Sequence, residues 1–184
     1  MKTLVVYFSF SGNNKLLAEE LKSILDCEIM QIHEPRKRTG FSIFLDVLFR
    51  RTPKIMTRHG RISQYDHVIL VAPVWAGRIA NPLKSFLKLA KPHLNDYSFI
   101  TLCGAGGNKG LRDELRKLAG KEPVSFMELA VRDLLPTEKK DNVRYTSGYK
   151  IQLRDIEPYR RSIKLFLGKA LPNQSDTLLP NIPL

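Results

Sequence analysis

Apolar runs of strand length alternate with segments of helical periodicity along nearly the whole chain. Five apolar runs are expected to form strands, at residues 3–8, 28–33, 65–71, 99–103 and 124–129. The run at 3–8 is β-branched and aromatic, and the one at 28–33 is recognised by its alternating pattern. Helices are expected where apolar residues recur every three or four positions, at 15–25, 41–49, 82–89, 109–119 and 155–170. Because parallel strands need crossover connections, this order predicts an α/β fold with a five-stranded parallel sheet and helices on both faces.

Length and composition are consistent with one such domain. The chain has 184 residues, of which 43% are hydrophobic and 26% are charged, close to the average of globular proteins. We expect a single domain over residues 1–171. A tail over residues 172–184 contains three prolines and no periodicity, so we expect it to be loosely ordered.

The cysteine content and the apolar runs favour a cytoplasmic protein. Cys27 and Cys103 form no CxxC motif, which argues against a zinc site and suits a reducing compartment. The N-terminal apolar run is too short for a secretory signal. No run of 18 apolar residues is present, so no segment is expected to span a bilayer as a helix.

Three loops are expected at the carboxyl ends of the strands, where ligands bind to sheets of this kind. The first, Ser9 to Asn14, opens a helix with hydroxyls, amides and free backbone N–H groups, which can hold a phosphate without a lysine. It lacks the GxxxxGK[ST] and GxGxxG patterns, so a nucleotide triphosphatase and a dinucleotide site are disfavoured. The alternative is a turn in which a serine or an asparagine only caps the helix.

The second and third loops, at 72–79 and 103–108, carry an aromatic ring and a run of glycines. Trp75, the single tryptophan of the chain, can stack on a flat ligand or pack beneath its own loop. The glycines after Cys103 let the backbone approach a ligand closely, or they form a flexible turn. The order of the three loops along one sheet edge favours a binding site.

These loops resemble those of the flavodoxin-like family of FMN-binding proteins. The matching segments are YFSFSGNNKLLAEEL at 7–21, APVWAGRIANPLKSFL at 72–87 and TLCGAGGNKG at 101–110. The resemblance covers about residues 1–170, and it implies a three-layer sandwich with sheet order 2-1-3-4-5. Asn14 departs from the family pattern, because it stands where the phosphate loop has a hydroxyl residue.

The resemblance also implies which residues bind the cofactor. The residues that hold the FMN phosphate are then Ser9, Ser11, Gly12, Asn13 and Asn14. One side of the isoalloxazine ring is lined by Pro73, Val74, Trp75, Ala76 and Gly77. The residues near the pyrimidine edge of the ring are Cys103, Gly104, Gly106 and Gly107.

Bound flavin would carry the redox chemistry, so no catalytic side chain and no metal site is expected. The four histidines, His33, His59, His67 and His93, are scattered and are expected at the surface or beside strands. The sequence therefore predicts an FMN-binding protein that transfers electrons or reduces a small acceptor such as a quinone. The alternative is a flavodoxin-like fold without flavin that serves as a binding or regulatory module.

The charge is concentrated after the second strand. The formal net charge is +12, and residues 35–61 hold eight basic residues and one acidic residue. The predicted helix in this segment has an apolar face formed by Phe41, Phe44, Leu45, Leu48 and Phe49. Either this face packs on the sheet and the arginines are solvated, or the segment contacts an acidic redox partner or an anionic membrane. No nucleic-acid motif is present, and a homodimer remains open.

Overall fold

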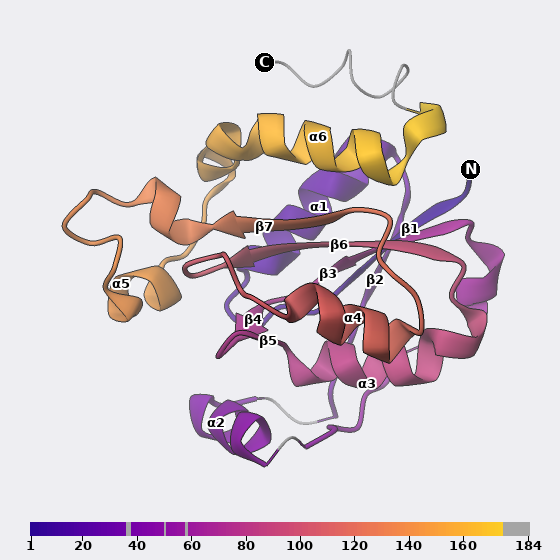
Figure 1. Ribbon diagram of the computed structural model, residues 1–184, viewed down its shortest axis with the longest axis horizontal. Coiled ribbons are helices and arrows are strands. Elements are labelled where there is room, and N and C mark those ends of the chain that lie inside the picture. The colour runs from indigo at the N-terminus through magenta and orange to yellow at the C-terminus, as the bar shows by residue number, and fades with distance from the viewer. Residues whose placement is uncertain (36–37, 50, 58, 175–184) are drawn as a thin grey trace.

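A five-stranded sheet forms the middle layer of the protein, and helices cover both of its faces (Figure 1). The computed structural model describes residues 1–35, 38–49, 51–57 and 59–174. The strands of this sheet are β1 Thr3–Tyr7, β2 Glu28–Gln31, β3 His67–Val71, β6 Asp96–Cys103 and β7 Phe126–Ala130. All neighbouring pairs are parallel. The predicted α/β class and parallel sheet are confirmed.

The strand order is β2-β1-β3-β6-β7. Counted within this sheet, it is the order 2-1-3-4-5 expected from the sequence. The chain adds β2 on one side of β1 and then crosses to place β3 on the other side. The order therefore reverses between β1 and β3, and the loops that follow these two strands flank the reversal point.

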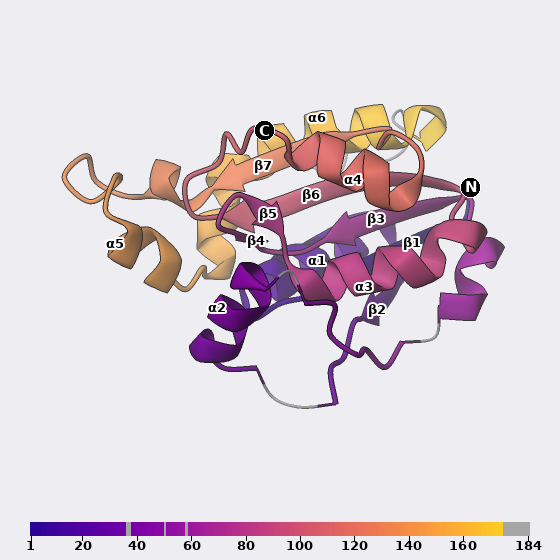
Figure 2. The same ribbon diagram turned by 60° about the horizontal axis from the view of Figure 1, so that its bottom comes forward.

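One layer of helices lies on each face of the sheet (Figure 2). Two apolar clusters of buried side chains pack between the sheet and these helices. The helices α1 Asn13–Leu25 and α6 Arg160–Ala170 pack on one face. The helices α3 Asn81–Ala90 and α4 Leu111–Ala119 pack on the other. The residues expected to face inward from the last helix are all buried: Ile156, Tyr159, Ile163, Phe166 and Leu167. This helix begins as a 3₁₀ segment, Leu153–Tyr159, which contains Pro158.

The loop after β3 is a β-hairpin, which the sequence analysis did not predict. Its strands are β4 Val74–Trp75 and β5 Arg78–Ile79, paired antiparallel. Ala76 and Gly77 form the two-residue turn with φ of 47° and 72°. A turn of this kind matches the twist of two antiparallel strands, so two such short strands can pair.

Helix α5, Val143–Gly148, was also not predicted and lies beyond the carboxyl end of β7 (Figure 1). Asn142 caps it by accepting a hydrogen bond from the N–H of Arg144 at 3.0 Å. The segment that holds α5 returns past the first loop before the chain enters the last helix. A helix of six residues leaves little periodicity to detect, so only the capping asparagine gave a signal.

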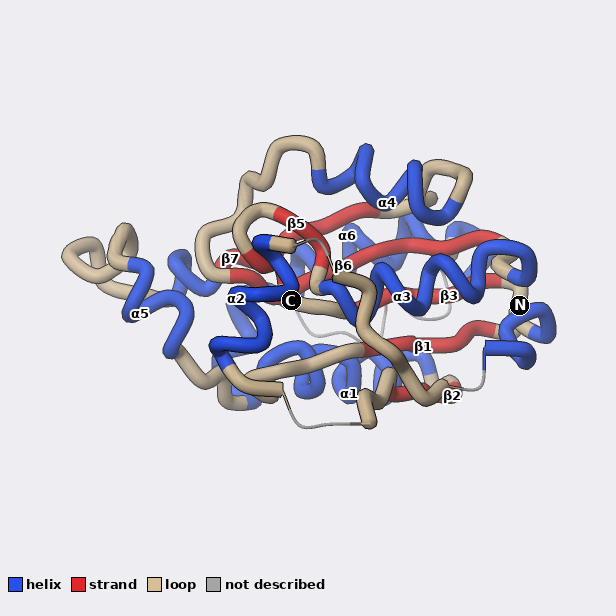
Figure 3. The backbone as a smooth tube through the Cα atoms, turned by 90° about the horizontal axis from the view of Figure 1, so that it is seen from below, coloured by secondary structure: helices blue, strands red, loops and turns tan. Residues whose placement is uncertain are grey.

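Helix α2, Gly40–Leu48, forms where the sequence predicted a helix and stands outside the layer that contains α3 (Figure 3). Thr39 and Ser42 form a capping box at its start. Leu48 and Phe49 at its end are 59% and 60% exposed, so this end of the apolar face does not pack on the sheet. The side chains of Phe41 and Phe44 lie outside the described part of the structure.

The predicted tail is described only at its start. Pro172–Gln174 form a short 3₁₀ turn, and residues 175–184 lie outside the described residues. Within the part of the chain that the structure covers, no helix is both long and apolar enough to cross a membrane.

Candidate functional site

Three loops meet at the carboxyl edge of the sheet because β1, β3 and β6 are neighbours in it. The first loop leads from β1 into α1, the β4-β5 hairpin follows β3, and a glycine-rich loop follows β6. These are the loops in which the sequence analysis placed the candidate binding residues. The fold therefore brings all three candidate groups to one edge.

The first loop exposes backbone N–H groups at the start of α1. Gly12 occupies the N-cap position with φ of 100°, and its N–H donates a hydrogen bond to the Oγ of Ser9 at 3.1 Å. Ser11 and Gly12 are exposed. The first N–H groups of a helix lack intrahelical partners and carry the positive end of the helix dipole, so this turn is suited to an anion.

The asparagine side chains of this loop serve the tertiary structure. The Asn14 amide donates from Nδ2 to the Leu102 carbonyl at 2.9 Å and accepts the Leu102 N–H on Oδ1 at 3.0 Å. Asn13 donates to the Tyr149 carbonyl at 2.8 Å and accepts the Ile151 N–H at 3.1 Å. Asn14 therefore fastens α1 to β6, and Asn13 fastens it to the segment after α5. A phosphate contact from either residue is left to its backbone N–H group.

Trp75 lies on the hairpin, partly exposed, among three neighbouring side chains. The ring of Phe8 meets it at 5.8 Å between centroids and that of Phe10 at 6.5 Å, both nearly perpendicular. The guanidinium carbon of Arg38 stands 5.4 Å from the centre of the Trp75 ring. Trp75 is thus partly buried against the apolar core, and it is not a free platform, because Phe8, Phe10 and Arg38 also contact its ring.

The second strand of the hairpin is fastened to α4 through Glu114. Its carboxylate accepts the Ile79 N–H at 3.0 Å and the Lys84 ammonium at 2.8 Å, and the guanidinium of Arg78 lies 3.7 Å away. A cavity of about 610 Å³ lies between the hairpin turn and the start of α4. Its lining residues include Ala76, Gly77, Arg78, Lys109, Asp113 and Lys117. The hairpin is therefore held to α4 through β5, and its turn borders this cavity.

The glycines of the third loop differ in what surrounds them. A Cβ added at Gly104 would lie 3.4 Å from the Thr146 hydroxyl, and one at Gly106 would lie 3.1 Å from the Ala130 Cβ. At Gly107, whose φ is 65°, an added Cβ would meet nothing within 4 Å. Gly104 and Gly106 are therefore explained by close packing within the protein, whereas Gly107 borders open space.

Glu128 shapes the end of this loop and the surroundings of Cys103. The carboxylate accepts the backbone N–H of Asn108 at 3.2 Å and also bonds its side-chain amide. The Cys103 Sγ lies 3.7 Å from a Glu128 oxygen. Burial and, secondarily, the Glu128 charge raise the pKa of the Cys103 thiol to about 12. The thiol is therefore protonated at neutral pH.

Of the predicted strand-flanking histidines, His67 lies at the amino end of β3, far along the strand from the candidate site. Its Nε2 is 2.9 Å from the Ser98 Oγ, and burial lowers the pKa of His67 to about 4. His33 instead lines a cavity of about 330 Å³ beside the first loop. Phe8, Phe10, Glu34 and Arg38 also line this cavity.

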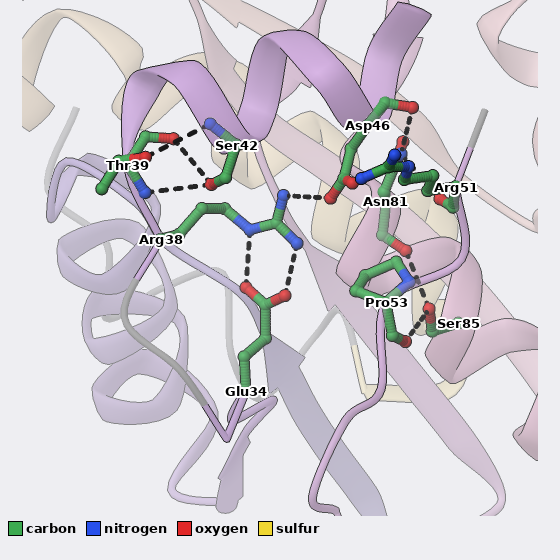
Figure 4. Close-up of polar contacts among 9 residues, drawn as sticks. All are labelled: Glu34, Arg38, Thr39, Ser42, Asp46, Arg51, Pro53, Asn81 and Ser85. Atoms are coloured by element: carbon green, nitrogen blue, oxygen red, sulfur yellow. Dashed lines mark hydrogen bonds and ion pairs between the residues drawn. The ribbon is translucent and has the colours of Figure 1, made fainter. Parts of the chain in front are cut away.

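Residues 35–61, the basic segment, are joined to this edge by side chains that the sequence analysis did not single out. Asn81, at the start of α3, donates to the carbonyls of Asp46 and Arg51 at 2.9 and 2.8 Å (Figure 4). Ser85, one turn later, donates to the Pro53 carbonyl at 2.8 Å. The segment is thus docked on α3 by hydrogen bonds to its backbone, which sequence patterns do not reveal.

The strand order and the position of the site identify the architecture. The fold is flavodoxin-like. No family model and no curated protein matches this sequence. Among solved structures, a flavoprotein from Lactobacillus acidophilus NCFM in complex with FMN is similar to the flavodoxin-like chain described above, with a TM-score of 0.62 and 22% identity. That match covers 69% of this chain and 92% of the other.

The apo-form of the flavoprotein from Lactobacillus acidophilus NCFM gives a TM-score of 0.57 with 21% identity. It covers 77% of this chain and 96% of the other. Nearly the whole of each neighbour therefore aligns, whereas this flavodoxin-like chain has additional residues outside the match.

Proposed function

We propose that this chain binds FMN at the carboxyl edge of its sheet and uses it to transfer electrons or to reduce a small acceptor such as a quinone. The carrying observation is that the open start of α1 and the Trp75 hairpin flank the reversal between β1 and β3. Doubly wound sheets of this order bind FMN at that point. The similar structure with FMN bound supports the same assignment.

The residues of the first loop fit the phosphate. An added Cβ at Gly12 would meet nothing within 4 Å, so space lies beside the exposed turn. The Ser11 hydroxyl and the backbone N–H groups of Asn13 and Asn14 are the donors we assign to the phosphate oxygens. The side chains of both asparagines are already bonded elsewhere. The phosphate would therefore be held by neutral donors and the helix dipole, without a lysine or an arginine from this loop.

The other two loops fit a flat ring. We assign the hairpin from Pro73 to Gly77, with Trp75 at its centre, to one side of the isoalloxazine. Cys103 and Gly107 are assigned to the pyrimidine side, where Gly107 borders open space. Gly104 and Gly106 are assigned to the support of this wall, because their neighbours are Thr146 and Ala130.

FMN, when bound, supplies the redox chemistry, and the protein supplies binding, orientation and electrostatics. The protonated Cys103 thiol, with its pKa raised to about 12, contributes no thiolate at this wall. We therefore assign no covalent role to a side chain of this chain.

Titration of the purified protein with FMN tests the proposal. Binding should quench flavin fluorescence and saturate at one FMN per chain, and the holoprotein should be reduced by an electron donor. NADH and NADPH are to be compared as donors, and a series of quinones as acceptors. Rapid quinone turnover favours a reductase, whereas a stable one-electron-reduced protein without turnover favours a carrier. No quenching at saturating FMN contradicts the proposal.

A flavin-free binding module is the second candidate, and one observation favours it. The amides of Asn13 and Asn14, both expected to reach the phosphate, are engaged in bonds within the protein. If backbone donors alone do not hold the phosphate, the same edge would bind another ligand. The FMN titration separates the two candidates directly.

We also propose that the end of α2 contacts a negatively charged partner, either an acidic redox protein or an anionic membrane. Leu48 and Phe49 are exposed there, and the Arg51 guanidinium lies 5.3 Å from the Phe49 ring. Apolar side chains flanked by cations are typical of surfaces that bind anionic interfaces. The support is the combination of exposure and charge at one end of the helix.

A further inference from the structure

A buried ionic cluster is formed by Arg38 with Glu34 and Asp46 (Figure 4). It links the basic segment to the hairpin, because the Arg38 guanidinium lies over the Trp75 ring. The Arg38 side chain is 7% exposed, and its carboxylate partners Glu34 and Asp46 are 11% and 13% exposed. The Arg38 Nε donates to Glu34 at 2.7 Å, and Nη2 donates to the other oxygen of the same carboxylate. Nη1 donates to Asp46 at 2.5 Å.

These three residues come from three different parts of the chain. Glu34 follows β2, Arg38 precedes α2, and Asp46 lies within α2. The two carboxylates use three of the donors of the planar guanidinium, so both the position and the orientation of its plane are determined. The same group lies over the Trp75 ring, on an element that none of the three belongs to.

The cost of this burial indicates that the cluster has a role beyond stability. Removing charged groups from water is costly, and a buried ion pair is often no more stabilising than packed apolar side chains. A fixed guanidinium over an indole, however, restricts where the ring can lie through cation–π attraction. The edges of Phe8 and Phe10 restrict it from other directions.

We infer that Arg38 is a positioning residue that, held by Glu34 and Asp46, fixes the Trp75 indole at the carboxyl edge of the sheet. The basic segment then forms part of the wall of the candidate ring site, and Arg38 is not one of its free cations. The claim that this wall receives an isoalloxazine ring rests on the proposed function. The claim that Arg38 positions Trp75 does not depend on it.

The first experiment uses the protein without flavin. Trp75 is the only tryptophan, so fluorescence excited at wavelengths where tyrosine does not absorb reports on this ring alone. Arg38→Lys keeps the charge but cannot reproduce a two-point pairing with Glu34 together with planar stacking. We expect its tryptophan emission to shift to longer wavelength and acrylamide quenching to increase. Arg51→Lys is the matched control, because Arg51 lies in the same segment over Phe49 and should leave both signals unchanged.

The second experiment measures FMN affinity by fluorescence titration in a double-mutant cycle. Arg38→Lys should raise the Kd for FMN about tenfold, since an ordering contact of this kind is worth about that factor. In a Trp75→Leu background, the same substitution should have no further effect, because Arg38 acts through the indole. Equal weakening in both backgrounds would overturn the inference.

The outcomes separate the inference from the proposed function. Unchanged emission and unchanged acrylamide quenching in Arg38→Lys would overturn the positioning role, whether or not FMN binds. If the wild-type protein binds no FMN, the proposed function fails and the fluorescence comparison alone still decides the role of Arg38. Should Arg38→Lys not fold, Asp46→Asn removes one of the two carboxylates, and it should change the emission of Trp75 in the same direction.

Discussion

The first loop and the basic segment meet at the same sheet edge, where residues of both line one cavity, but they are built in opposite ways. The first loop carries no charged side chain from Ser9 to Asn14, and its amides are bonded to the backbone of distant segments. The basic segment is highly charged, yet Arg38 is buried between two carboxylates. Residues that sequence patterns mark as ligand donors can serve the fold, and residues that look like a free charged surface can serve the site.

The largest expected effect is a loss of stability from a substitution in the uncharged first loop. Asn14→Ala should lower the free energy of unfolding by about 3 kcal/mol, because it leaves the buried N–H and carbonyl of Leu102 without partners. Urea unfolding measures it. The matched control is Asn95→Ala, whose exposed amide makes one bond to the Tyr65 carbonyl and should cost about 1 kcal/mol or less. Equal costs for the two variants would contradict the structural role of Asn14.

The next largest expected effect is a loss of stability in acid. We expect it to arise at His67, which belongs to neither the first loop nor the basic segment. His67 has its pKa lowered to about 4 in the folded protein, whereas an unfolded histidine titrates near 6.5. Between these two pKa values His67 binds a proton in the unfolded chain but not in the folded one. The free energy of unfolding therefore falls as pH drops from about 6.5 towards 4. From pH 7 to pH 5 the loss should be about 2 kcal/mol.

Urea unfolding at both pH values, on the wild type and on His67→Gln, isolates this contribution. The variant should lose less stability than the wild type between pH 7 and pH 5. If the two proteins lose the same amount of stability, the acid sensitivity comes from groups other than His67.

A smaller effect, on the Kd for FMN, tests whether the first loop contacts the phosphate or the ring. Ser11→Ala should raise the Kd for FMN about fivefold, because one neutral hydrogen bond is lost. The Kd for riboflavin, which lacks the phosphate, should not change. Because Ser11 is exposed, the free energy of unfolding should stay within about 0.5 kcal/mol of the wild type. An equal loss for both flavins would place Ser11 beside the ring and break the assignment of this loop.

The smallest effect concerns the exposed end of α2. Leu48→Ser should reduce binding to vesicles that contain anionic lipid about threefold, by removing apolar surface from the contact. Leu165→Ser is the control, because Leu165 is exposed to a similar degree, 56% against 59%, on the opposite face of the sheet. Binding that both variants retain in full would favour an acidic protein over a membrane as the partner.

Much of the fold was predictable because it is encoded in local patterns. Each main-sheet strand lies in a short apolar or alternating run, and both helical layers have apolar faces, so element type and class followed from periodicity. The hairpin of Val74–Trp75 and Arg78–Ile79 was missed because two-residue strands have no periodicity. Helix α5 was missed for the same reason.

The candidate site was predictable as a set of loops and less so as a set of contacts. The resemblance placed Trp75 and Gly107 at the edge, and the structure brings both loops there. It could not show that Gly104 and Gly106 face Thr146 and Ala130, since those neighbours are distant in sequence. Arg38 was counted only as one charge among eight.

The sequence by itself determined the order of elements, the parallel sheet and the edge at which its loops gather, because periodicity and chain connectivity act over short distances. Only the tertiary structure decided what the polar side chains do. Asn14 meets Leu102, and Arg38 meets both Asp46 and Trp75, through contacts that exist only once separate segments are packed together. A buried polar group must find its partner wherever the fold places one, and no local pattern encodes that position.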